Sequence, residues 1–226
     1  ITKIFSTGHS FAALRVDGSV VTWGNKYRYD GKSRAAGDSS VVASQIDASA
    51  TPNPTSVVKT IASTYNDFAA LRADGSVVVW GFQGRPNEYP QYAGTGYGST
   101  EVAEISATFD AFAFRHDGGS VTTVGSTLYG GDSSEFAGSI NGRGSPDIVG
   151  IYSSFGAFAA LREDGSVVTW GGSEFGGDSS SVANELDASG TPKVEAIYST
   201  ERAFAAVRED GSVVVWGDYG YGGHPA

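Results

Sequence analysis

The sequence contains no cysteine and no methionine among its 226 residues. Without cysteine the chain has no disulfides, thiolate metal sites, iron–sulfur ligands or cysteine nucleophiles. Basic residues are scarce, since 15 Lys and Arg stand against 25 Asp and Glu and leave a formal net charge of −10. Because an acidic protein repels phosphates, we expect no nucleic-acid partner. The missing initiator methionine suggests a processed protein or part of a longer one.

Long apolar runs are also missing. The longest, such as Val77 to Trp80, is far too short to cross a bilayer, and no signal-peptide pattern opens the chain. We therefore expect no membrane insertion. Glycine is abundant instead, with 32 residues against only 7 prolines and without a collagen period. This composition favours a fold with many turns over a disordered chain.

One phrase recurs along the chain and defines its organisation. It reads FAALRVDGSVVTWG at 11–24, FAALRADGSVVVWG at 68–81, FAALREDGSVVTWG at 158–171 and FAAVREDGSVVVWG at 204–217, with a weaker copy, FAFRHDGGSVTTVG, at 112–125. An isoleucine stands seven residues before each copy, at Ile4, Ile61, Ile105, Ile151 and Ile197, in steps of 57, 44, 46 and 46. The period is therefore about 46 residues, which is typical of a propeller or solenoid repeat.

Each repeat predicts three strands and one helical turn. An Asp-Gly pair between apolar runs predicts a hairpin with a two-residue type I′ turn. Four copies have this pair, at Asp17-Gly18, Asp74-Gly75, Asp164-Gly165 and Asp210-Gly211, and Gly118-Gly119 takes its place in the third. A further strand precedes each hairpin, as in Val194–Thr200. After the hairpin, Asp38, Asp132 and Asp178 are expected to cap a helical turn with apolar residues four apart, such as Val182 and Leu186.

Tandem sheets of this kind bury their faces against their neighbours. Trp23, Trp80, Trp170 and Trp216 share one repeat position, which indicates packing between sheets rather than ligand platforms. We therefore predict an all-β, five-bladed propeller with a short helical turn in each blade. It forms a single domain over residues 1–226, with units at about 1–56, 57–100, 101–146, 147–192 and 193–226.

The first copy carries a family resemblance. From Gly8 it reads Gly-His-Ser-Phe-Ala-Ala-Leu, and from Asp17 it reads Asp-Gly-Ser-Val-Val-Thr-Trp-Gly. This resembles the regulator-of-chromosome-condensation propeller repeats in a short variant, and the resemblance covers the whole chain. It implies a propeller fold and a docking platform. The family-like histidine stands only at His9, and the acidic charge does not suit chromatin, so nucleotide exchange, the founding member's activity, is not carried over.

Binding is expected where the copies differ. The loops 25–36 and 82–98 depart most from the repeat and hold five of the 11 tyrosines, which offer large amphipathic contact areas. The segments between first and second strands also vary, and a closed ring would gather them on one face. The expected ligand contacts are Lys26, Tyr27, Arg28, Tyr29, Lys32, Arg34, Arg85, Asn87, Tyr89, Tyr92, Tyr65, Asn66 and Asp67. The alternative interpretation is tolerated loop insertion and ordinary variation of turns.

No catalytic residue, cofactor or metal site is predicted. His9, His116 and His224 occupy different repeat positions without metal-ligand spacing. Asp38, Asp132 and Asp178 lack the dense oxygen pattern of a calcium loop, although calcium binding there stays open. Phosphate-cradling loops, nucleophile elbows and paired carboxylates are all missing from the sequence. Arg15, Arg72, Arg162 and Arg208 each stand two residues before the hairpin Asp, where a local ion pair is expected.

These observations predict a non-enzymatic recognition module that binds a protein or a glycan, outside the cell or on its surface. One alternative is an enzyme, either a polysaccharide-active propeller or an exchange-factor-like propeller for a GTPase. Another is a structural repeat or self-assembling element of a larger adhesin-like protein.

Overall fold

The computed structural model describes residues 1–25, 36–48, 57–81, 101–140 and 145–224. The chain divides into two compact units. Unit 1 comprises Ile1–Thr95 and Thr100–Ile105, and unit 2 comprises Gly96–Ser99 and Ser106–Ala226. A single domain over the whole chain stays a prediction.

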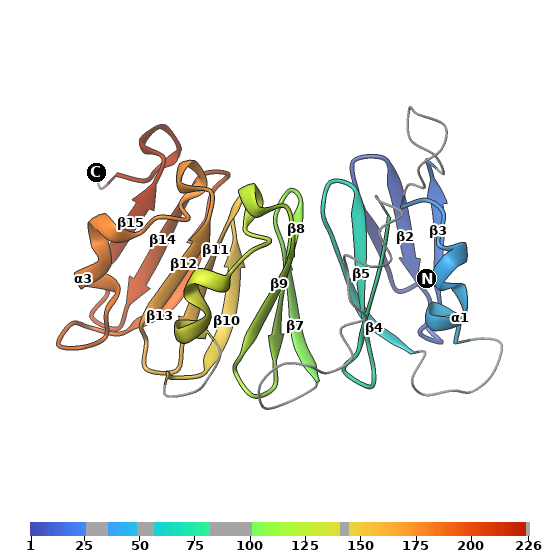
Figure 1. Cartoon of the computed structure of the whole chain (residues 1–226), viewed down its shortest axis with the longest axis horizontal. Helices are drawn as coiled ribbons and strands as arrows, with labels where there is room; N and C mark the ends of the chain where they lie inside the picture. Colours follow the sequence, from blue (N-terminus) through green and yellow to red (C-terminus); the bar gives the residue numbers. More distant parts are fainter. Residues whose placement is uncertain (26–35, 49–56, 82–100, 141–144, 225–226) are drawn as a thin grey trace. The chain divides into compact units, whose positions relative to one another are not determined.

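The described residues form five three-stranded antiparallel sheets, each in simple chain order (Figure 1). Sheet 1 contains β1 (Lys3–Ser6), β2 (Ser10–Leu14) and β3 (Val20–Gly24); sheet 2 contains β4 (Val58–Ser63), β5 (Asp67–Arg72) and β6 (Val77–Gly81); sheet 3 contains β7 (Val102–Ala107), β8 (Ala111–His116) and β9 (Val121–Gly125). Sheet 4 contains β10 (Ile148–Ser153), β11 (Ala157–Arg162) and β12 (Val167–Gly171), and sheet 5 contains β13 (Val194–Ser199), β14 (Ala203–Arg208) and β15 (Val213–Gly217). The all-β class and the five repeated units are thus confirmed. Closure into one five-bladed ring stays a prediction.

The strand register is the same in every sheet. The repeated phenylalanine stands opposite the repeated tryptophan in the pairs Phe11–Trp23, Phe68–Trp80, Phe158–Trp170 and Phe204–Trp216. In sheet 3, Phe112 stands opposite Val124 at the same position. Because side chains alternate between faces, this register places the phenylalanine and its partner on one face of each sheet.

The hairpin turn differs from the predicted type. The N–H of Gly18 donates to the Arg15 carbonyl at 3.0 Å, and the Arg15 N–H donates to the Ser19 carbonyl at 2.9 Å. The loop therefore has three residues, with Gly18 alone at its left-handed end at φ +81°. The prediction of a two-residue type I′ turn was therefore wrong. The Asp17 carboxylate accepts from the N–H and the hydroxyl of Ser19, at 2.9 and 2.7 Å, and these hydrogen bonds form an Asx turn that sets the shape of the loop.

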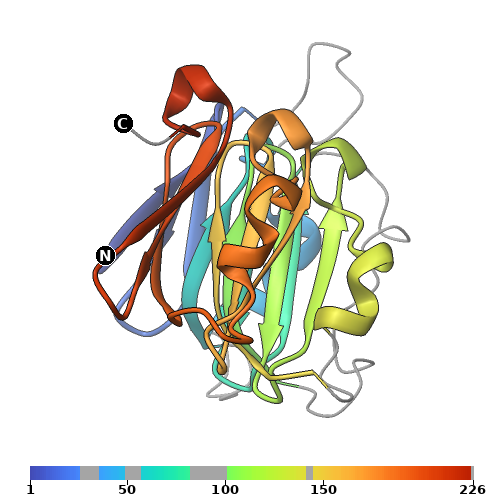
Figure 2. The same cartoon turned by 90° about the vertical axis from the view of Figure 1, so that its left-hand side faces the viewer.

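The helical turns after the hairpins are confirmed where the structure describes them. They are η1 (Ser40–Val42) with α1 (Ala43–Ile46), η4 (Ser134–Phe136) with α2 (Ala137–Ile140), and η6 (Ser180–Val182) with α3 (Ala183–Leu186), and Figure 2 shows α2 in yellow and α3 in orange. The carboxylates of Asp38, Asp132 and Asp178 each accept from the N–H two residues further on, at 2.9–3.0 Å. Among the described helices, none has the length and apolarity needed to span a bilayer.

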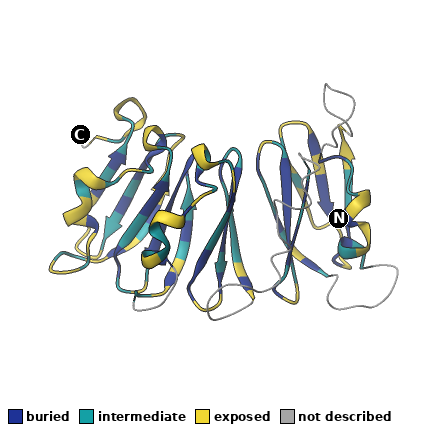
Figure 3. Cartoon of the chain, in the orientation of Figure 1, coloured by how far each residue is buried: buried dark blue, intermediate teal, exposed yellow. Residues whose placement is uncertain are grey.

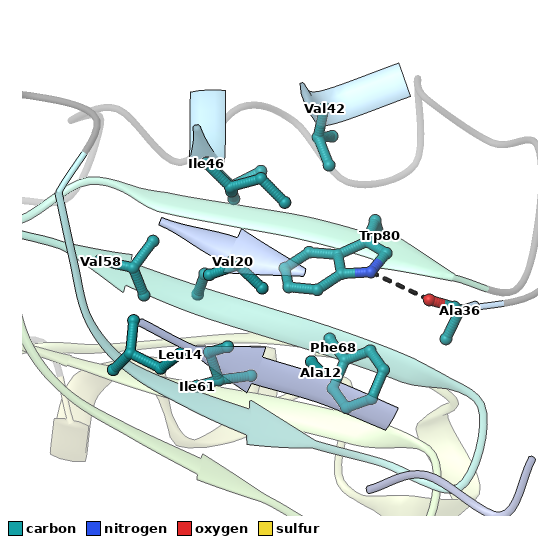
Figure 4. Close-up of a cluster of buried hydrophobic side chains, with 12 residues drawn as sticks. Ala12, Leu14, Val20, Ala36, Val42, Ile46, Val58, Ile61, Phe68 and Trp80 are labelled. Carbon is teal, nitrogen blue, oxygen red and sulfur yellow. Dashed lines mark hydrogen bonds between the residues drawn. The ribbon is translucent and has the colours of Figure 1, made fainter. Parts of the chain in front are cut away.

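Within each unit, the core lies between successive sheets. In unit 1, Trp80 and Phe68 of sheet 2 pack on Ala12 and Leu14 of sheet 1, and the indole Nε1 of Trp80 donates to the Ala36 carbonyl at 3.1 Å (Figure 4). Unit 2 repeats this arrangement twice. Trp170 donates to the Gly130 carbonyl at 3.1 Å and Trp216 to the Gly176 carbonyl at 3.0 Å. Buried residues accordingly follow the middle of the strands (Figure 3).

The packing role predicted for the four tryptophans holds for three of them. Trp80, Trp170 and Trp216 are buried between sheets. For Trp23 the prediction was wrong, since its side chain is 42% exposed. Trp23 belongs to sheet 1, the first sheet in chain order among the described residues.

Candidate binding edge

The segments between the first and second strands are each shaped by one hydroxyl. A serine or threonine stands three residues after the repeat isoleucine in every copy, at Thr7, Thr64, Thr108, Ser154 and Thr200. At Thr7, Thr64, Ser154 and Thr200 the hydroxyl oxygen accepts from the backbone N–H three residues later, at 2.9–3.1 Å. The sequence interpretation did not recognise these residues, although their constant offset from the isoleucine was the signal.

Successive segments are joined by backbone hydrogen bonds. In unit 1 the Gly8 N–H donates to the Tyr65 carbonyl at 2.9 Å. In unit 2 the Phe109 N–H donates to the Phe155 carbonyl at 2.8 Å, and the Phe155 N–H donates to the Glu201 carbonyl at 2.9 Å. Each unit therefore has a continuous edge, which we call the first-loop edge. It comprises residues 7–9 and 64–67 in unit 1 and residues 108–110, 154–156 and 200–202 in unit 2.

The unit 1 edge exposes an aromatic pair. The Tyr65 ring is 42% exposed and meets the His9 ring edge-on, with 5.1 Å between centroids. The ring lies over Gly8 so closely that a Cβ there would clash with it. Asn66 is half-buried, whereas Asp67 is buried with its carboxylate beside the Thr64 hydroxyl. Of the three predicted contacts on this edge, Tyr65 and Asn66 reach the surface and Asp67 lies within the loop.

The unit 2 edge carries a row of aromatic rings that ends in a cation. Phe109 stacks on Phe155 with 4.7 Å between centroids, and Phe155 lies 5.4 Å from Phe175. The guanidinium of Arg202 lies over the Phe175 ring at 5.2 Å and over the Tyr221 ring at 5.0 Å. Such contacts stabilise a partly exposed cation and fix its position. This half of the edge thus presents rings and an oriented guanidinium, whose Nε lies 3.6 Å from the Glu201 carboxylate.

The remaining predicted contacts lie outside the described residues. They are Lys26, Tyr27, Arg28, Tyr29, Lys32 and Arg34 of the first variable loop and Arg85, Asn87, Tyr89 and Tyr92 of the second. Their assignment as ligand contacts stays a prediction.

The repeated arginines and hairpin aspartates serve the turns. The Arg72 Nε donates to the Ser76 hydroxyl at 2.6 Å and lies 3.8 Å from the Asp74 carboxylate, as the predicted local pair requires. The Ser19 hydroxyl and N–H both donate to Asp17 and hold the pKa of that carboxyl below its usual value. At the last helical turn, a hydrogen bond from the Ser180 N–H likewise lowers the pKa of the Asp178 carboxyl.

Sheet 3 departs from the other sheets at its hairpin. His116 replaces the repeated arginine, and its buried ring places Nε2 at 3.0 Å from the Thr122 hydroxyl. Burial lowers the pKa of His116 and favours the neutral ring. Gly118 replaces the aspartate, so the buried Ser120 hydroxyl has no hydrogen-bond partner among the described residues. No group of three His, Cys, Asp or Glu side chains suited to a metal occurs in the part of the chain that the structure describes.

The comparisons with known proteins identify a class of fold. A scan of protein-family models and a search of curated proteins each find no match. Solved structures do match, and they include propellers: Prp20p from Saccharomyces cerevisiae, described with its binding to Gsp1p and histones, is 19% identical over 95% of this chain and 56% of that chain, with a TM-score of 0.58. Yeast RCC1 (Prp20) bound to Kap60 is 22% identical over the same shares, with a TM-score of 0.57.

A plant ectodomain gives a similar match. The CRINKLY WD40 ectodomain of the Arabidopsis thaliana receptor kinase ACR4 is 14% identical over 99% of this chain and 65% of that chain, with a TM-score of 0.52. Identities this low show the fold alone. The fold is therefore of the RCC1-like propeller type, and the chain spans little more than half of the yeast protein.

Proposed function

We propose that this protein is a non-enzymatic binding module that contacts a protein partner through its first-loop edge. The observation that carries the proposal is the contrast between backbone and side chains along this edge. One pattern of hydroxyl and inter-sheet hydrogen bonds recurs, while the exposed side chains differ from copy to copy. A rigid edge with varied side chains suits recognition, since binding residues concentrate on loops held by a rigid scaffold.

The chemistry of the edge favours a protein partner. Tyr65, His9 and Asn66 offer an aromatic surface with polar atoms at its margin, and Arg202 offers a cation whose position is already fixed. Tyrosine and arginine are enriched among residues that dominate protein interfaces. The yeast neighbours support the proposal by analogy, because their structures concern binding to Gsp1p, histones and Kap60.

The finer parts of the proposal extend to the two variable loops. The loop 25–36 places four basic residues in an acidic protein. This composition suits an acidic surface on the partner. We include the ligand contacts at Lys26, Tyr27, Arg28, Tyr29, Lys32 and Arg34 and at Arg85, Asn87, Tyr89 and Tyr92 in the proposed interface. An extracellular or cell-surface location also belongs to this proposal, and secretion of the full-length gene product tests it.

Two variants test the interface. Fluorescently labelled protein is applied to a protein array and a glycan array as wild type, as Tyr65→Ala/Asn66→Ala, and as Tyr27→Ala/Arg28→Ala/Tyr29→Ala. We expect protein spots that both variants lose, with melting temperatures close to that of the wild type. The control is Val16→Ala, because Val16 is 84% exposed at the hairpin tip, the opposite end of sheet 1 from its first loop.

The results separate the proposal from its alternatives. Binding confined to glycans would replace the protein partner by a carbohydrate. Turnover of a polysaccharide, or acceleration of nucleotide release from a GTPase, would show an enzyme or exchange factor. Protein binding that survives in both variants would refute the assignment of the interface.

A further inference from the structure

Each interface between successive sheets has two different halves. The leading half belongs to the later sheet and consists of the repeated isoleucine, phenylalanine and tryptophan, as in Ile151, Phe158 and Trp170 of sheet 4. The trailing half belongs to the earlier sheet. It combines apolar side chains with a backbone carbonyl that accepts from the indole, as Gly130 does from Trp170. The two halves differ in their side chains and fit each other.

Sheet 1 exposes a complete leading half. Ile4, Phe11 and Trp23 are 57%, 44% and 42% exposed. The equivalent residues of sheet 2, Ile61, Phe68 and Trp80, are 4%, 0% and 4% exposed. The Phe11 and Trp23 rings nevertheless stack at 5.4 Å, as the corresponding buried pairs do in the later sheets. The leading half of sheet 1 therefore has the geometry of the established interfaces but lacks their cover.

Sheet 5 exposes the matching trailing half. Tyr198 is 64% exposed, whereas the equivalent Tyr152 of sheet 4 packs against the apolar cluster between sheets 4 and 5. Tyr221, at the end of η7 (Tyr219–Tyr221), is 41% exposed, whereas the equivalent Phe175 is 6% exposed. The residue after Tyr221 is Gly222. It is equivalent to Gly176, whose carbonyl accepts from the indole of Trp216.

Sheet 5 is also followed by a glycine equivalent to those whose carbonyls accept from the indoles. Gly130 and Gly176 follow their helical turns at φ +89° and +91°, and their carbonyls accept from Trp170 and Trp216. Gly222 follows η7 in the same conformation, at φ +97°. In unit 1, the Trp23 Nε1 makes no hydrogen bond to any residue that the structure describes.

We propose that a second copy of this chain docks head to tail, with the leading half of sheet 1 in one copy seated on the trailing half of sheet 5 in the other. Trp23 Nε1 then donates to the Gly222 carbonyl of the second copy. The contact continues the interface that already joins sheets 1 and 2, 3 and 4, and 4 and 5. Apart from Tyr221, whose ring also contacts Arg202, it uses different side chains from the proposed protein-binding edge, so different variants test the two proposals.

The two halves differ, so the association is heterologous. Each open assembly still exposes one leading half at one end and one trailing half at the other. Further copies therefore add until a ring closes or a filament forms. The assembled mass therefore rises with concentration in multiples of one chain.

Sedimentation velocity over a range from micromolar to hundreds of micromolar tests the proposal. Trp23→Lys damages the leading half, and Tyr198→Lys damages the trailing half. We expect each variant to remain monomeric where the wild type associates, with association weakened at least about tenfold, as loss of an interface hot spot predicts. Val16→Lys is the matched control, because it adds the same charge at a residue that is 84% exposed outside both halves.

An equimolar mixture of the two variants gives the sharpest result. Trp23→Lys keeps its trailing half and Tyr198→Lys keeps its leading half, so the mixture forms dimers and nothing larger. Far-UV circular dichroism establishes that both variants are folded. Trp23→Phe, which removes only the indole donor, is the milder second variant and weakens association severalfold.

Three outcomes would overturn the proposal. The wild type would stay monomeric throughout if the chain's own sheet 5 covered Trp23. A mixture that stays monomeric would show that the leading and trailing halves do not bind each other. Unchanged association of Trp23→Lys would place the contact elsewhere.

Discussion

At the scale of single residues, the hairpin aspartate holds the turn by accepting hydrogen bonds from a serine, and one copy lacks this aspartate. Asp17, Asp164 and Asp210 each accept from the hydroxyl and the N–H of the serine two residues later. In sheet 3 the aspartate is replaced by Gly118, and the Ser120 hydroxyl is left buried without a partner among the described residues. A buried polar group without a partner costs stability.

Restoring the aspartate should therefore stabilise the protein. We expect Gly118→Asp to raise the free energy of unfolding by about 0.5–1.5 kcal/mol, the usual net worth of such a hydrogen bond. Urea denaturation measures it. Asp164→Gly is the reverse substitution in sheet 4 and should lower stability by a similar amount. If both substitutions leave the midpoint unchanged, the Asx turn contributes nothing to stability.

His116 gives the fold a pH dependence of its own. Burial holds its pKa below the ordinary value of 6.5, so the unfolded chain binds a proton before the folded chain does. Stability is then complete above that value and declines as the pH falls toward the folded pKa. The lowered pKa values of the aspartates affect stability in a separate pH range. Their contribution to stability is lost only as the pH falls below 3.8, the ordinary pKa of an aspartate.

The measurement is the urea midpoint between about pH 7.5 and about pH 5.5. We expect the wild-type midpoint to fall on acidification and the His116→Gln midpoint to fall less. An equal decline in both proteins would show that His116 does not account for the pH dependence.

At the scale of elements, much of the fold was predictable because the same strand and turn signals recur in every repeat. The period located every sheet, and Asp178 with Val182 and Leu186 located a helical turn whose apolar residues pack as expected. The turn type was missed because it depends on side-chain hydrogen bonds from Ser19, which an Asp-Gly pair alone does not reveal. The position of Trp23 was missed because burial depends on a neighbouring sheet rather than on the repeat itself.

The candidate site was less predictable than the fold. Variation between copies singled out Tyr65 and Asn66, of which Tyr65 is exposed and Asn66 half-buried, and their role as ligand contacts stays a prediction. It did not reveal that Gly8 bonds to the Tyr65 carbonyl, because that contact joins residues 57 apart in sequence through backbone atoms. Nor did it show that Asp67 is buried within the loop.

The indole hydrogen bond makes the sheet interface testable. Trp170→Phe keeps an aromatic ring but removes the donor to the Gly130 carbonyl, which is left buried and unpaired. We expect a loss of about 1–3 kcal/mol in the free energy of unfolding. Trp23→Phe is the matched control at an exposed position and should change stability by less than about 0.5 kcal/mol. Equal losses would mean that Trp23 is packed like Trp170.

At the scale of the whole molecule, charge and association act against each other. Two copies with a formal charge of −10 repel, whereas the proposed contact between them is apolar. Salt screens the repulsion and leaves apolar contacts intact. We therefore expect self-association in sedimentation experiments to strengthen as the salt concentration rises. Weakening by salt would instead indicate an interface built from charge pairs.

The central claim is that one repeated interface joins successive sheets within each unit and that sheet 1 exposes the side chains of its leading half. Fluorine NMR of protein labelled with fluorotryptophan tests it most directly, with the four signals assigned by single Trp→Phe substitutions. In dilute solution, we predict that the Trp23 signal shifts strongly between H₂O and D₂O while the signals of Trp80, Trp170 and Trp216 do not. A Trp23 signal as protected as the other three would contradict the account.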